Sequence, residues 1–136
     1  MVMKKTSWKT RLILAMIISM FVVSTAWAAP RWSHLTYISG HIEIDDDNDA
    51  WVSVVADASP QDADTLTVKC ELQQLKNSWK TIKSWTEKSD DTSVLLDGEY
   101  AVYKGYSYRI KVTAKAYKGS TLKETVTEYF NYGYYN

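Results

Sequence analysis

The sequence is poor in the residues that define several classes of protein. Its 136 residues include one cysteine, two prolines and five glycines. A single cysteine excludes a fold held by internal disulfides and a zinc site with four cysteine ligands. Few prolines and glycines, together with 13% aromatic residues, exclude a fibrous chain and a disordered one. The length is that of one domain with its own hydrophobic core.

The sequence also lacks the short motifs of the common enzyme classes. It contains no Gly-x-Ser-x-Gly, no His-Glu-x-x-His and no phosphate-binding loop. His34 and His41 are its only histidines, and a zinc pair at these positions has no third ligand at a recognisable spacing. We therefore expect two surface histidines, no cofactor and no enzymatic activity. A small extracellular hydrolase without a recognisable motif is the alternative.

The N-terminal segment has the three parts of a secretory signal peptide. Four basic residues within 4–11 precede an apolar run over 12–23, and Ala26 and Ala28 form a small-residue cleavage site. The run is shorter than the roughly 20 apolar residues that a membrane-spanning helix needs. We predict a helical signal peptide that is cleaved after Ala28, with Ala29 as the neighbouring alternative, and a protein that is secreted and does not stay in the membrane.

This division changes the charge of the protein. The whole chain has 16 basic and 16 acidic residues, but residues 1–28 hold four basic residues and no acidic one. The single domain over 29–136 therefore has 12 basic and 16 acidic residues, a formal charge of −4. Residues 41–64 hold eight acidic and no basic residues, and residues 104–123 hold six basic and no acidic residues. Export and the negative net charge argue against nucleic acid as a partner. We expect solvated faces, with head-to-tail self-association of opposite patches as the weaker alternative.

Alternation of apolar and polar residues with period two is the dominant pattern after the signal peptide, and it predicts β-strands. The alternation is cleanest over 106–116 and 66–72. Weaker strands are expected at 35–44, 51–58, 78–87, 92–96 and 122–129. Turn-forming residues separate these segments, and no segment shows a helical period. Seven short antiparallel strands at this spacing predict an all-β fold, a seven-stranded β-sandwich. The predicted core comprises Val52, Val54, Leu66, Val68, Cys70, Leu72, Tyr108, Ile110, Val112 and Ala114.

Three residues before and within the cleanest strand carry a resemblance. Val102, Gly105 and Tyr108 have the spacing of an apolar residue, a glycine turn and a tyrosine. This resembles the tyrosine corner of fibronectin type III and immunoglobulin-like domains, in which the tyrosine hydroxyl bonds back to the corner backbone. Lys104 stands where that family usually has proline, and Trp51 is the candidate for a displaced counterpart of its second-strand tryptophan. The chain also resembles small secreted proteins of Gram-positive bacteria, which implies a compartment alone.

Two further features invite a chemical interpretation. Asp45, Asp47 and Asp49 have the spacing of calcium ligands in an EF-hand loop, but the glycine and the closing glutamate of that loop are missing. We expect a solvated hairpin loop, with calcium binding as the alternative. Cys70 shares its parity with core residues, so we expect a buried thiol that behaves as a small hydrophobic group.

Aromatic residues supply the candidate ligand contacts. On a regular strand Trp79 and Trp85 share one face, where their rings would form a platform for sugar rings. The tail contributes Tyr132, Tyr134 and Tyr135, which either project as a contact surface or fold back over the end of the domain. We expect a non-catalytic binding module for an extracellular or cell-envelope protein partner. A carbohydrate-binding module that uses these aromatic rings is the alternative.

Overall fold

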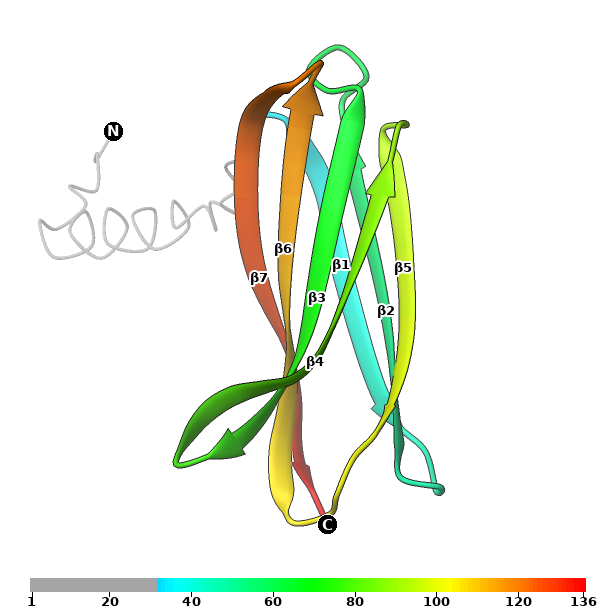
Figure 1. Cartoon of the computed structure of the whole chain (residues 1–136), viewed down its shortest axis with the longest axis vertical. Helices are drawn as coiled ribbons and strands as arrows, with labels where there is room; N and C mark the ends of the chain where they lie inside the picture. Colours follow the sequence, from blue (N-terminus) through cyan, green and yellow to red (C-terminus); the bar gives the residue numbers. More distant parts are fainter. Residues whose placement is uncertain (1–31) are drawn as a thin grey trace, which may run out of the picture. The chain divides into compact units, whose positions relative to one another are not determined.

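The computed structural model describes residues 32–136, which form seven antiparallel strands and no helix (Figure 1). The strands are β1 (Leu35–Ile44), β2 (Asp49–Ala58), β3 (Thr65–Lys76), β4 (Ser78–Ser89), β5 (Ser93–Ala101), β6 (Tyr106–Lys118) and β7 (Thr121–Tyr135). All seven predicted strands are confirmed, and most extend beyond the segment that the alternation predicted. The signal peptide and the cleavage after Ala28 lie outside the described residues.

The strands form two sheets that pack face to face (Figure 1). One sheet has the strand order β1-β2-β5, and the other has the order β4-β3-β6-β7. Inward side chains of both sheets form a single core between them. The predicted core is confirmed, because all ten residues are buried: Val52, Val54, Leu66, Val68, Cys70, Leu72, Tyr108, Ile110, Val112 and Ala114.

The chain passes from β5 into β6 at a corner held by Tyr108, whose side chain is fully buried. Its hydroxyl donates to the carbonyl oxygen of Tyr103 at 2.6 Å and accepts from the backbone N–H of Tyr103 at 3.0 Å. The side-chain amide of Gln74 also donates to this hydroxyl, at 2.9 Å. Gly105 turns the chain with a φ of +94°, in the region that favours glycine. The bond from the tyrosine hydroxyl to the corner backbone is the one that the sequence motif predicts.

Each open edge of the sandwich is closed by an aromatic ring that lies on a glycine of the other sheet. Trp85 of β4 covers Gly98 of β5, where an added Cβ would lie 2.5 Å from Cε2 of the indole. Phe130 of β7 covers Gly40 of β1, where a Cβ would also overlap the ring. Because these glycines have no side chain, the rings reach the backbone and complete the core at both edges.

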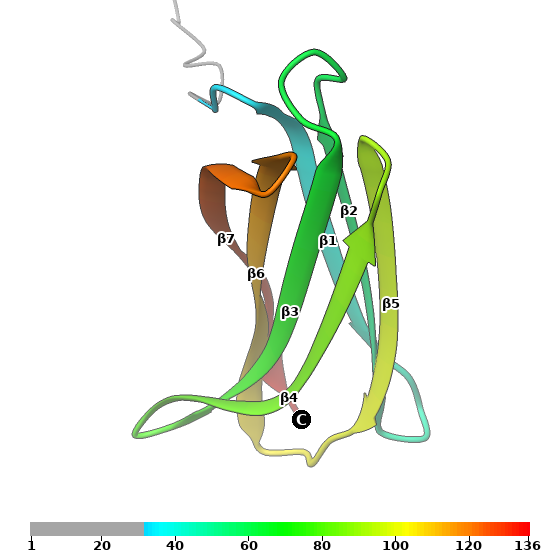
Figure 2. The same ribbon diagram turned by 45° about the horizontal axis from the view of Figure 1, so that its top comes forward.

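The hairpin formed by β3 and β4 has a bulge that changes its course. Leu72 pairs with Lys83 and Gln73 pairs with Thr81, so Ile82 has no partner residue in β3. An extra residue of this kind bends the strand and increases its twist. The end of the hairpin accordingly turns away from β5 and projects past β6 and β7 (Figures 1 and 2).

Candidate binding faces of the sandwich

The outer surface of the three-stranded sheet is acidic. Successive side chains of a strand point to opposite faces. The residues that alternate with the buried ones along each strand therefore point outward. Five carboxylates do so: Glu43 on β1, Asp49 and Asp57 on β2, and Asp97 and Glu99 on β5. The three strands contain no lysine or arginine. We call this surface the acidic face.

Large apolar side chains are exposed on the same acidic face. Tyr37, Trp51 and Leu95 are 51%, 49% and 60% exposed. Trp51 lies on the central strand β2, where the register places it between Glu43 and Glu99. A shallow depression of about 310 Å³ beside it is lined by His41, Glu43, Trp51, Val52, Ser53 and Asp97. Exposed aromatic and aliphatic groups among polar ones are typical of surfaces that contact other proteins.

Trp51 is held in one orientation by the loop that precedes β2. Its indole Nε1–H donates to Oδ2 of Asp45 at 2.9 Å, and Oδ1 of Asp45 accepts the backbone N–H groups of Asp47 and Asp49, each at 3.0 Å. The bond from Trp51 is the largest cause of a lowered pKa of Asp45, followed by the bond from Asp49. The strand parity of Trp51 turns it outward, away from Val52, as its place in the sequence alternation indicates.

The Asp45–Asp49 loop is a hairpin turn in which Asp45 organises the backbone. The backbone N–H of Asn48 donates to the carbonyl oxygen of Asp45 at 3.1 Å, and Asn48 has a φ of +64°. Both carboxylate oxygens of Asp45 already accept bonds from the loop and from Trp51. Within residues 32–136, no three His, Cys, Asp or Glu side chains are grouped to hold a metal ion. The geometry therefore gives the calcium hypothesis no ligand set.

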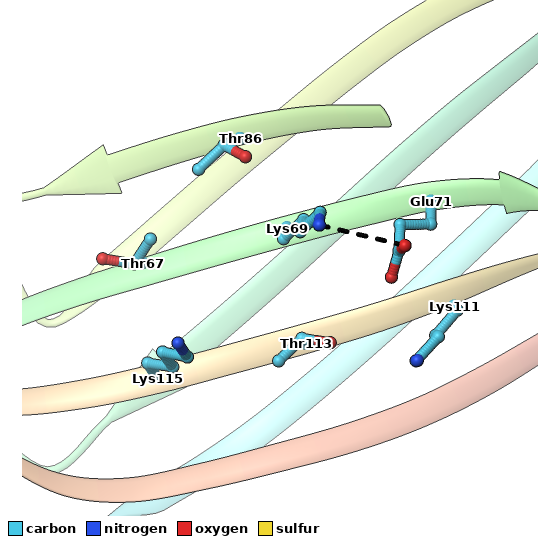
Figure 3. Close-up of a pocket in the computed structure, with 7 residues that line it drawn as sticks. All are labelled: Thr67, Lys69, Glu71, Thr86, Lys111, Thr113 and Lys115. Atoms are coloured by element: carbon cyan, nitrogen blue, oxygen red, sulfur yellow. Dashed lines mark ion pairs between the residues drawn. The ribbon is translucent and has the colours of Figure 1, made fainter. Parts of the chain in front are cut away.

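The outer surface of the four-stranded sheet has the opposite charge. Its outward residues include one carboxylate, Glu71, and five basic residues: Lys69 on β3, Lys88 on β4, and Arg109, Lys111 and Lys115 on β6. A shallow depression of about 410 Å³ on it is lined by Thr67, Lys69, Glu71, Thr86, Lys111, Thr113 and Lys115 (Figure 3). We call this surface the basic face.

The lysines of the basic face differ in their pairing. Nζ of Lys69 lies 3.9 Å from Oε1 of Glu71, the ion pair drawn in Figure 3. The hydroxyl of Thr81 also donates to Glu71, at 3.3 Å. Among the described residues, no carboxylate lies within ion-pair distance of Lys111 or Lys115. These two ammonium groups are therefore open to charges on another molecule.

One end of the basic face is built around Arg109. Its guanidinium carbon lies 4.2 Å from the ring centroid of Trp79 and 4.4 Å from that of Tyr129. Its Nε–H donates to Oε1 of the buried Gln73 at 2.8 Å. A guanidinium between two rings gains cation–π attraction and holds both rings in place. The stack joins the projecting hairpin to β6 and β7.

Trp79 and Trp85 do not form the shared platform that a regular strand would give them. Trp85 pairs with the core residue Cys70, whereas Trp79 pairs with Leu75, five residues further along β3. Residues that are an odd number of positions apart on a strand point to opposite faces, so the partners Cys70 and Leu75 do so. The bulge at Ile82 puts Trp79 and Trp85 opposite such a pair. Trp85 packs against the core and Trp79 stacks on the basic face. The alternative of a platform formed by both rings therefore has no basis in the strand geometry.

The aromatic tail completes β7 and folds over the end of the sandwich. The backbone N–H of Gly105 donates to the carbonyl oxygen of Tyr135 at 2.7 Å, and the Tyr135 hydroxyl donates to the side chain of Asn48. Tyr135 is buried, so it is not available as a ligand contact. Tyr132 packs edge-on against it with ring centroids 6.2 Å apart, and Tyr134 is exposed.

The remaining candidate residues have structural environments. Cys70 is fully buried, and burial raises the pKa of its thiol to about 12. His41 is exposed near Glu43, with Nε2 and Oε1 3.3 Å apart. His34 is partly buried, with Nδ1 3.9 Å from Oδ1 of Asp62. The two histidines have different neighbours and share no ligand group.

A scan against protein-family models finds no match to the chain, and a search of curated proteins finds no relative. Among residues 32–136 there is no helix with the length and apolar character that a membrane crossing requires. The argument for function therefore rests on the two faces themselves.

The acidic face is the site that the sequence analysis did not identify. The parity of Trp51, opposite to that of Val52, is visible in the sequence, where Trp51 is considered only as a displaced counterpart of a family tryptophan. The same alternation places Tyr37 on β1 and Leu95 on β5 outward. Two outward apolar residues on strands that carry only acidic charges would have been the signal.

Proposed function

We propose that the protein is a secreted, non-catalytic binding module of the fibronectin type III or immunoglobulin-like class. Its acidic face binds an extracellular or cell-envelope protein. Sheets of three and four strands, with β5 beside β2 and β3 beside β6, support this class, as does the corner at Tyr108. The signal-peptide pattern of the first 28 residues supports export.

The exposed and oriented indole of Trp51 is the observation that carries this proposal. Tryptophan is enriched among the residues that contribute most to protein–protein binding. Because Asp45 already holds the ring, a partner that covers it loses little further conformational entropy. The carboxylates of Glu43 and Glu99 flank the ring, and they favour a partner with a basic surface.

Photo-crosslinking from the acidic face tests the proposal. A benzoylphenylalanine replaces Ser53, which pairs with His41 and Asp97 in the middle of the acidic face. A matched control carries the same group at the exposed loop residue Gln61. Producing cells are irradiated, and the adducts are separated and weighed by mass spectrometry.

We expect a discrete protein adduct from position 53 and none from position 61. Trp51→Ala in the position 53 variant should remove the adduct, and Thr127→Ala, on the other sheet, should preserve it. Equal adducts from positions 53 and 61, or an adduct that persists in Trp51→Ala, would contradict the proposal. The mass of the adduct separates a second copy of the chain from a different protein.

A further inference from the structure

We infer that the basic face of a second copy fits the acidic face, so that copies of the protein stack face to face. This inference rests on the proposed function, because it names the partner of the same surface. Both surfaces of the contact belong to the described residues, so their charge and size can be compared directly.

The charges of the two faces oppose in sign and are similar in number. The acidic face has five carboxylates and no lysine or arginine among its strands. The basic face has five basic residues and Glu71, a balance of +4. Opposite surface potentials steer two molecules into register and disfavour contacts between like faces. The acidic face therefore selects the basic face of another copy over a second acidic face.

The basic face also has groups that a partner can engage. Lys111 and Lys115 lie on the same face of β6, on either side of Thr113, without a carboxylate partner among the described residues. Trp79 and Tyr129 hold Arg109 in a fixed position at the end of the face. The aromatic rings on this face and the exposed Trp51 and Leu95 on the acidic face add apolar surface that the contact removes from water.

The dimensions of the faces predict a weak contact. Three strands about 4.8 Å apart and about 33 Å long span roughly 460 Å². Two such faces together bury roughly 900 Å², which is at the low end for specific interfaces. The association is therefore expected to depend on concentration and to weaken with salt, because exposed charges are screened.

The two faces lie on opposite sides of the sandwich, on the outer surfaces of its two sheets (Figure 1). When the acidic face of one copy binds the basic face of another, the pair still has one free basic face and one free acidic face. The stack is therefore open, and longer assemblies form as the concentration rises. Opposite charges on the two faces of one small domain thus allow copies of the protein to assemble without a second protein.

Charge reversal on each face separately tests the inference. One variant carries Lys111→Glu and Lys115→Glu, and a second carries Asp97→Lys and Glu99→Lys. A control carries Lys104→Glu and Lys118→Glu, exposed positions at the two ends of β6, with the same change in net charge as the first variant. Sedimentation of protein recovered from the medium of producing cells is measured over a range of concentration and salt.

Wild type and control should associate at low salt, and each face variant alone should associate at least about tenfold more weakly. An equimolar mixture of the two face variants should recover the association as pairs, because the intact acidic face of one variant meets the intact basic face of the other. Wild type that stays monomeric at every concentration, or a mixture that fails to associate, would overturn the inference. If the adduct from position 53 persists in that case with the mass of a different protein, the proposed function stands.

Discussion

At the scale of single residues, the hydroxyl of Tyr108 satisfies three buried or partly buried polar groups at once. It serves the carbonyl and the N–H of Tyr103 and the side-chain amide of Gln74. A hydroxyl has one donor and two acceptor positions, so its capacity is fully used. This hydroxyl therefore joins the corner between the two sheets to β3 and β6, beside the backbone bonds from Val102 to Asn48 and from Gly105 to Tyr135.

Tyr108→Phe is expected to lower the free energy of unfolding by about 2–3 kcal/mol, because it leaves buried donors and an acceptor without partners. Urea unfolding followed by tryptophan fluorescence measures the change. Tyr117→Phe is the matched control, since Tyr117 lies on the same strand and its hydroxyl bonds to no other described residue. Equal losses in the two variants would show that the corner bonds do not stabilise the fold.

At the scale of strands, two aromatic rings close the edges of the sandwich. Each ring packs on a glycine of the other sheet, which has no side chain to keep the ring away. Trp85 on Gly98 and Phe130 on Gly40 occupy equivalent places at the two edges. Covered edges have fewer unpaired groups open to other chains. The edge contacts also leave the two outer faces free for binding.

Gly98→Ala is expected to lower the free energy of unfolding by about 1–3 kcal/mol, because the added methyl overlaps the ring of Trp85. In a Trp85→Leu background the same substitution should cost less, since the smaller side chain can move aside. Thermal unfolding of the four proteins gives the interaction term of this cycle. An identical loss in both backgrounds would refute the packing contact.

The sequence predicts the strands and the core better than it predicts the candidate sites, and the reason is local. Alternation over 66–72 and 106–116 fixes which side chains face inward, whatever their partners are. No local sequence pattern marks the bulge at Ile82, because a bulge is defined by how β4 pairs with β3. The alternation alone therefore places Trp79 and Trp85 on one face, and it leaves open whether the tail projects or folds back over the end of the sandwich.

At the scale of the whole molecule, two sheets with opposite charges on their outer faces explain the segregation of charge along the sequence. β1, β2 and β5 carry five carboxylates and no lysine or arginine, and half of the 12 basic residues over 29–136 lie on β3 and β6. The opposite charges of the two faces largely cancel in the net charge, which therefore reveals neither face. The acidic face, with Trp51 at its centre strand, is the surface on which the function is proposed to depend.

Residue-resolved NMR of ¹⁵N-labelled protein at increasing concentration tests this account most directly. The account predicts that the indole N–H of Trp51 and outward residues of β2, β5, β3 and β6 shift together as concentration rises. It also predicts that about 0.5 M salt, where the Debye length is about 4 Å, reverses the shifts. Shifts confined to the loops at the ends of the sandwich, or none on the acidic face, would contradict it.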